Sequence, residues 1–178
     1  MRMKLSHLIT SFSLTLILMI VFEVITSSLL PALGWFEYRL ALNVLVILFL
    51  AIRLNAPILP WLIMTLQFVH SAFSIEGWAL GTLAGIIVMI VANYLKELLQ
   101  LTTPIVAMLT ALFFQFVWFL TVAVVLCLKI SSFEKFGMIV WSFVPGSIVL
   151  AILSPLIFGL MNLIWRVPAE GFSSGVEI

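Results

Sequence analysis

Residues 74–88 read SIEGWALGTLAGIIV, an apolar run in which Gly77, Gly81 and Gly85 recur at every fourth position. At about 100° per residue, positions spaced by four form one slowly drifting stripe along an α-helix. A phosphate-binding loop places its glycines before the helix, often followed by Lys-Ser or Lys-Thr, and this stretch has no such lysine. Small residues inside an apolar helix instead let a second helix approach closely. The stripe therefore predicts a helix contact, either within one bundle or with another protein.

The chain around this stretch has the composition of a membrane protein. Of its 178 residues, 65% are hydrophobic and 8% are charged, and the mean hydropathy is +1.35, whereas an ordinary soluble domain carries about 25% charged residues. Most of the sequence divides into apolar runs of roughly 20 residues, the length that crosses a bilayer. These runs lack the alternation of a β-barrel wall. We therefore expect one domain, residues 1–178, that is an all-α integral membrane bundle in contact with bilayer lipid.

Prolines, glycines and charges divide the chain into six expected transmembrane spans. The N-terminal apolar run is too long for a signal-peptide core and no clear cleavage site follows it, so we expect it to be retained as the first span. A short tail, residues 166–178, follows the last span. The expected spans are residues 8–30, 35–52, 57–75, 77–95, 104–128 and 137–165.

Charge predicts the orientation of these spans, because cytoplasmic segments carry an excess of Lys and Arg. Six spans place both ends of the chain on the same side. With the N-terminus inside, the inner segments hold five of the eight basic residues, namely Arg2, Lys4, Arg53, Lys96 and Arg166. The outer segments hold Arg39, Lys129 and Lys135. We therefore expect both termini, and with them the tail, in the cytoplasm.

Four polar residues within the expected spans are candidates for a function: Glu23, Gln67, His70 and Gln115. An ionised Glu23 in the first span costs several kcal/mol unless it is paired, protonated or near water. Its role is either a polar contact in a site or subunit interface, or an internal hydrogen bond to a Ser, Thr or Asn of a neighbouring span; a position close to the lipid headgroups is the third alternative. His70 and Gln67 lie near the outer end of the third span and are placed to line a small polar mouth with Glu76. A bond from His70 to a backbone carbonyl or to interfacial water is the alternative. For Gln115 we expect an interhelical hydrogen bond.

The remaining composition excludes several classes of function. Aspartate is absent, Cys127 is the single cysteine, and the two histidines, His7 and His70, lie far apart in the sequence. A metal site, a bound cofactor and an intramolecular disulfide are therefore not expected. The chain also lacks a nucleophile paired with a base, so we do not expect an enzyme. The net charge of +1 is spread over single residues and indicates no nucleic-acid partner.

Two segments carry a resemblance to a known family. The stretch QFVHSAFSIEGWALGTLAGIIVMIVANYLKELL, residues 67–99, has a turn followed by a Leu-Gly pair that opens a long span, here Leu80 and Gly81. SPLIFGLMNLIWRV, residues 154–167, contains a proline near its start and an arginine near its end. In this order the features resemble the bacterial rod-shape-determining membrane protein family, MreD, over about residues 57–167. Relatives often carry an acidic residue before the turn where this chain has His70 or its neighbours, so no role is transferred from that acid.

The resemblance implies a non-enzymatic scaffold of the bacterial inner membrane that acts in cell-wall elongation. Its implied partners are an MreC-like bitopic protein and wall-synthesis membrane proteins, bound through helix faces; a homo-oligomer stays open. The family's fold is similar to the six-helix substrate-binding subunits of energy-coupling-factor transporters. A vitamin-binding subunit of such a transporter is therefore the alternative function, although Ser28 and Ala32 are the only small-residue pair on the first span that suits docking to a coupling protein.

Overall fold

The computed structural model describes residues 5–32, 40–55, 57–74, 77–96, 103–130, 136–165 and 176–177. Within these ranges the chain is mostly helical and has six helices, which confirms the predicted all-α class and the number of helices. They are α1 (Leu5–Ala32), α2 (Leu42–Arg53), α3 (Leu59–Ser71), α4 (Trp78–Leu95), α5 (Pro104–Ile130) and α6 (Phe136–Ile164). Several predictions lie outside the described residues: the tail apart from residues 176–177, the basic residues Arg2, Lys4, Arg39, Lys135 and Arg166, and the mouth residue Glu76.

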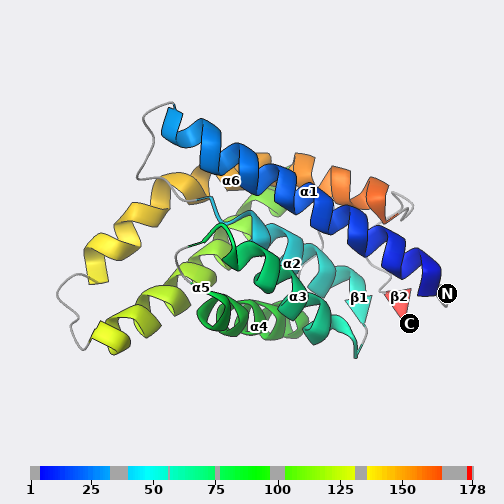
Figure 1. Cartoon of the computed structure of the whole chain (residues 1–178), viewed down its shortest axis with the longest axis horizontal. Helices are drawn as coiled ribbons and strands as arrows, with labels where there is room; N and C mark the ends of the chain where they lie inside the picture. The colour runs from blue at the N-terminus through cyan, green and yellow to red at the C-terminus, as the bar shows by residue number, and fades with distance from the viewer. Residues whose placement is uncertain are drawn as a thin grey trace.

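Two strands of two residues each join the end of α2 to the end of the chain. β1 (Leu54–Asn55) pairs in parallel with β2 (Val176–Glu177), so that Leu54 lies opposite Val176. Figure 1 shows β1, β2 and the start of α1 at the same end of the bundle.

Four of the six helices are long and apolar enough to cross a membrane. The candidate spans within them are Leu8–Ser28, Trp78–Leu95, Pro104–Lys129 and Val140–Ile164. The protein is therefore a multi-pass membrane protein. The side chains that face outward agree with this, because large apolar residues on α1, α5 and α6 are exposed over areas that soluble proteins rarely leave uncovered. Examples are Ile17, Val24, Leu109, Phe116, Ile152 and Leu163.

The second and third helices are shorter than the spans predicted at 35–52 and 57–75. α2 begins at Leu42, after two described residues that are not helical, and α3 ends at Ser71. Their 12 and 13 residues rise about 18 and 20 Å at 1.5 Å per residue, which is less than the roughly 30 Å of the hydrocarbon core. The prediction of six full spans is therefore corrected to four helices of spanning length and two shorter ones.

The reason for this difference is the position of α2. Every residue of α2 is buried, and the helix contacts each of the other five helices. Figure 1 shows α2 at the centre, with α1 and α6 on one side and α3 and α4 on the other. A helix surrounded by protein needs apolar residues on all its faces but does not need the length of the bilayer. Its sequence therefore has the hydropathy of a span without being one.

Hydrogen bonds between α1 and the end of α6 fix the N-terminal half of α1. The Ser11 hydroxyl donates to the carbonyl of Ile164 at 3.2 Å. The indole Nε1 of Trp165 donates to Thr15 Oγ1 at 3.1 Å, and both residues are buried. α6 also contains Pro145 and Pro155, and it changes direction along its length in Figure 1, as expected where proline interrupts the helical hydrogen bonds.

A candidate functional site within the bundle

A carboxylate and an imidazole meet inside the bundle where α1 passes α3. Glu23 Oε1 lies 2.7 Å from His70 Nδ1, and the two residues are 5% and 7% exposed. Either the imidazole N–H donates to a carboxylate, or a protonated carboxyl group donates to the imidazole. In both cases one proton lies between the two groups. The pairing meets the need of a carboxyl group inside a span for a partner.

Two amide side chains lie next to this pair. Gln67 is one helical turn before His70 on α3, and its Oε1 accepts a hydrogen bond of 3.4 Å from Nδ2 of Asn43 on α2. Both amides are 0% exposed. Within the described part of the chain, Asn43 Oδ1 and Gln67 Nε2 have no hydrogen-bond partner. We call Glu23, Asn43, Gln67 and His70 the polar cluster.

The glycine stripe of α4 packs against the same region. A Cβ atom added at Gly81 would lie 2.8 Å from Gln67 Oε1, and one added at Gly85 would lie 3.1 Å from both Ile47 Cδ1 and Ile63 Cγ2. Gly85 therefore lets α4 lie close to α2 and α3, and Gly81 lets it lie close to the Gln67 side chain of α3. The contact is internal to the chain.

Gly77 has a different role from the other two glycines. It precedes the first residue of α4 with φ of 79° and ψ of 162°, and a Cβ there would meet none of the described atoms within 4 Å. This backbone conformation is essentially restricted to glycine. Gly77 therefore supports the entry into α4 and takes no part in the helix contact of Gly81 and Gly85.

The fourth candidate from the sequence, Gln115, lies on α5. It is fully buried, and neither of its amide atoms has a hydrogen-bond partner among the described residues. The neighbouring turn holds Trp118, also fully buried, whose Nε1 is unpartnered in the same described set. The structure thus brings together three of the four predicted polar residues: Glu23 pairs with His70, and Gln67 lies one turn from His70. Among the described residues it shows no hydrogen bond from Gln115 to these three.

A second polar contact lies at the opposite end of α2. Arg53 is 3% exposed, its Nη2 donates to Asn162 Oδ1 at 3.0 Å, and its guanidinium lies 6.0 Å from the ring centre of Phe49. Partial burial lowers the pKa of Lys96, just beyond α4, and the positive charge of Arg53 lowers it further. The charge pattern of the sequence placed Arg53 in an inner segment at the end of the second expected span. Its place directly after the apolar residues of α2 was the available signal that it is buried.

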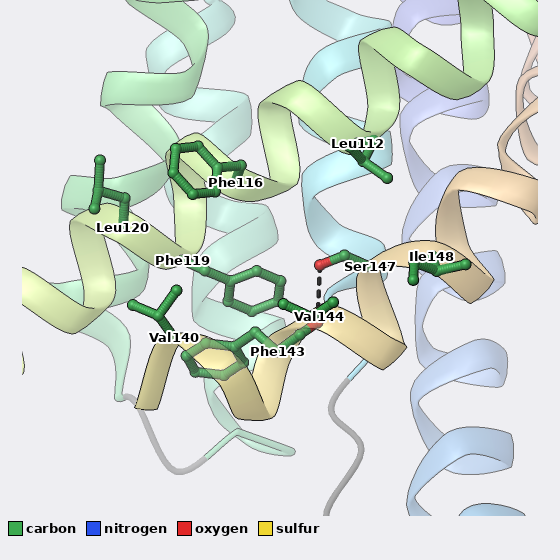
Figure 2. Close-up of a pocket in the computed structure, with 9 residues that line it drawn as sticks. All are labelled: Leu112, Phe116, Phe119, Leu120, Val140, Phe143, Val144, Ser147 and Ile148. Atoms are coloured by element: carbon green, nitrogen blue, oxygen red, sulfur yellow. Dashed lines mark hydrogen bonds between the residues drawn. The ribbon is translucent and has the colours of Figure 1, made fainter. Parts of the chain in front are cut away.

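An apolar pocket lies between α5 and α6, as Figure 2 shows. Its volume is about 130 Å³. The rings of Phe119 and Phe143 stack at 4.0 Å, and the Ser147 hydroxyl donates to the carbonyl of Phe143 at 2.9 Å, so that this hydroxyl is already bonded within α6. The pocket therefore suits an apolar group and offers little to a polar metabolite. Its lining residues are Leu112, Phe116, Phe119, Leu120, Val140, Phe143, Val144, Ser147 and Ile148.

The structure and the comparisons with known proteins were also searched for a metal site and for relatives. Within the described ranges, no three His, Cys, Asp or Glu side chains gather closely enough to hold a metal ion. Comparisons of the chain with protein-family models, with curated proteins and with solved structures found no match.

Proposed function

We propose that this protein is a non-enzymatic scaffold of the bacterial cytoplasmic membrane that binds other membrane proteins of the cell-wall elongation machinery. The observation that carries the proposal is the internal use of Gly81 and Gly85, the residues best suited to helix contact. Because α2 and α3 already pack against that stripe, a partner would bind to the outward faces of the long helices. The link to cell-wall elongation rests on the resemblance of about residues 57–167 to the MreD family.

The outward faces suit a partner that has a single membrane span. On α1, Ile17 and Val24 are 57% and 46% exposed and lie seven residues apart, on one side of the helix. On α5, Leu109 and Phe116 are 64% and 54% exposed with the same spacing. A bitopic protein of the MreC kind presents one apolar helix, which can pack along either face. With cytoplasmic termini, as the charge bias favours, such a complex joins components on the two sides of the membrane.

The vitamin-binding subunit of an energy-coupling-factor transporter remains the second candidate. The observation that favours it is the pair of buried, unpartnered amide atoms in the polar cluster, Asn43 Oδ1 and Gln67 Nε2, since buried polar atoms usually have partners. Two observations favour the scaffold instead. A Cβ atom added at Gly81 would lie 2.8 Å from Gln67 Oε1, so that α4 already packs closely against this amide, and the pocket between α5 and α6 is apolar.

Affinity purification from native membranes in gentle detergent, with mass spectrometry of the co-purified proteins, tests the proposal. We expect a bitopic protein and wall-synthesis enzymes. The double variant Ile17→Trp/Val24→Trp on α1, compared with Leu109→Trp/Phe116→Trp on α5, then locates the face: one pair should reduce recovery of the partner while both preserve thermal stability. Recovery of a coupling protein with paired ATPases would support the transporter instead. If both double variants recover as much partner as the parent protein does, binding through these faces is contradicted.

A further inference from the structure

We infer that the apolar pocket between α5 and α6 is a binding site for one acyl chain of a membrane lipid. This inference does not depend on the proposed scaffold function. It starts from the depth of the pocket along two helices of spanning length, from the side on which the pocket opens, and from the chemistry of its described lining residues.

The pocket lies at the depth of the lipid tails. Its lining on α5 falls within residues 112–120, and the candidate span of that helix is Pro104–Lys129. The lining therefore begins about 12 Å from one end of the span and ends about 14 Å from the other, at a rise of 1.5 Å per residue. The ring of Phe143 stacks on that of Phe119 at 4.0 Å, which holds the α6 side of the pocket at the same depth. The outward surface here meets hydrocarbon and not water.

The pocket opens sideways, towards the lipid. Phe119 and Phe143 form its floor and are only 3% and 4% exposed, and Figure 2 shows their rings between the two helices. The rim is open, because Phe116 on α5 and Ile148 on α6 are 54% and 49% exposed. An acyl chain can therefore enter from the surrounding bilayer without passing through the bundle.

The lining suits an alkyl chain better than water or a polar group. Ser147 is the polar residue among the described lining side chains, and its hydroxyl already donates to the carbonyl of Phe143 at 2.9 Å. A buried water molecule needs two to four polar partners, and this lining supplies at most the Ser147 oxygen. An unfilled pocket would leave its apolar walls without dispersion contacts. A lipid tail avoids both costs, because its methylene groups exchange contacts with other tails for contacts with the walls.

The size of the pocket limits its occupant to part of one chain. Its volume is about 130 Å³, close to the roughly 150 Å³ of an engineered apolar cavity in another protein that binds benzene, so about six carbons fit. A tail in the pocket contacts protein on the floor and on both walls, whereas a tail on an open helix face contacts protein on one side only. We therefore expect the bound tail to exchange more slowly than the surrounding lipid.

Photo-crosslinking in lipid nanodiscs tests this inference. The probe is a phosphatidylcholine with a diazirine in the middle of one acyl chain, diluted in unlabelled phosphatidylcholine, and mass spectrometry of the digested protein locates the labelled residues. Leu109 and Ile152 are the references for ordinary lipid contact, because they are 64% and 61% exposed and lie outside the lining. Phe114, on α5 and fully buried outside the lining, is the reference for a residue that no tail reaches. We expect Phe119 and Phe143 to be labelled at least as strongly as the exposed references, although both are buried.

Variants of Ser147 show whether this labelling depends on the pocket. Ser147→Phe places a ring in it and should abolish labelling of Phe119 and Phe143, whereas Ser147→Ala removes the hydroxyl without filling the space and should preserve the labelling. Ile152→Phe is the matched control, because it introduces a ring on the same helix outside the lining. If Ser147→Phe does not fold, as judged by its unfolding midpoint, Ser147→Leu takes its place.

Three results would overturn the inference. The first is labelling of Phe119 and Phe143 no stronger than that of Phe114, which would leave a side chain of a partner protein as the candidate occupant. The second is loss of labelling in Ser147→Ala, since the occupant would then need the hydroxyl. The third is undiminished labelling in the variant that fills the pocket.

Discussion

Glu23 Oε1 and His70 Nδ1 lie 2.7 Å apart, and this contact joins α1 to α3 through two residues that are 47 positions apart in the sequence. Each of these polar side chains would be unfavourable alone in an apolar span, and each provides the hydrogen-bond partner that the other needs. In the structure the pair lies one turn from Gln67, which in turn contacts Asn43 and the glycine stripe of α4. The polar cluster therefore connects α1, α2, α3 and α4 at one end of the bundle.

The first prediction concerns the stability that this pair contributes. Glu23→Leu should lower the free energy of unfolding by about 1–3 kcal/mol, because it leaves the buried His70 Nδ1 without a partner. Glu23→Gln should cost less, since its amide can still bond to the imidazole. Thermal unfolding in mild detergent at neutral pH measures both effects. Equal stability of the two variants would contradict a stabilising role of the hydrogen bond.

The second prediction concerns the glycine stripe. Gly85→Val should destabilise the bundle by about 1–3 kcal/mol, because the added atoms meet the fully buried side chains of Ile47 and Ile63. Gly159→Val on α6 is the matched control, since a Cβ there would meet none of the described atoms within 4 Å. Unfolding midpoints in the same detergent compare the two. A control as destabilised as Gly85→Val would show that the loss of glycine, and not the close contact, is responsible.

The sequence predicted the helical membrane class and six helices because hydropathy and punctuation depend on local composition. It did not separate α2 from the spans, because a helix buried in protein and a helix buried in lipid select the same residues. The distinction lies in length, and the run from Trp35 to Ile52 has no proline or glycine to indicate that the helix begins at Leu42.

The candidate site could be predicted only as separate residues. Glu23, His70 and Gln67 were recognisable because polar groups are costly within spans, but their pairing depends on how α1 crosses α3, which no local pattern encodes. Asn43 was not among the four candidates, and its bond to Gln67 gives it a place in the polar cluster. For the glycines, the spacing indicated a contact, and tertiary packing determined that α2 and α3 provide it.

The third prediction concerns Arg53 and Lys96. The charge of Arg53 lowers the pKa of Lys96, in addition to the larger effect of burial. Arg53→Gln should therefore raise the pKa of Lys96 toward its ordinary value, though not fully, because the burial remains. Since the neutral amine is the reactive form, acylation of Lys96 at a fixed alkaline pH should become slower in the variant. Mass spectrometry of the labelled protein measures this rate, and Lys129, on α5, provides the internal reference. An unchanged rate at Lys96 would contradict the electrostatic coupling.

The fourth prediction separates a bond between helices from a bond within one. The Thr15 hydroxyl donates to the carbonyl of Ser11 at 2.8 Å and accepts from Trp165 Nε1 at 3.1 Å. Thr15→Val keeps the shape of the side chain but leaves the buried indole N–H without its acceptor, so it should cost about 0.6–1.7 kcal/mol, the range for interhelical hydrogen bonds in membranes. Thr121→Val is the matched control, because the Thr121 hydroxyl donates to Val117 at 2.8 Å within α5, and a helical carbonyl that loses such a donor keeps its backbone partner. Unfolding in detergent, together with the emission of Trp165 in variants whose other tryptophans are replaced by phenylalanine, compares the two. A Thr15→Val variant as stable as the control would mean that the hydrogen bond from Trp165 to Thr15 does not help to hold the N-terminal half of α1.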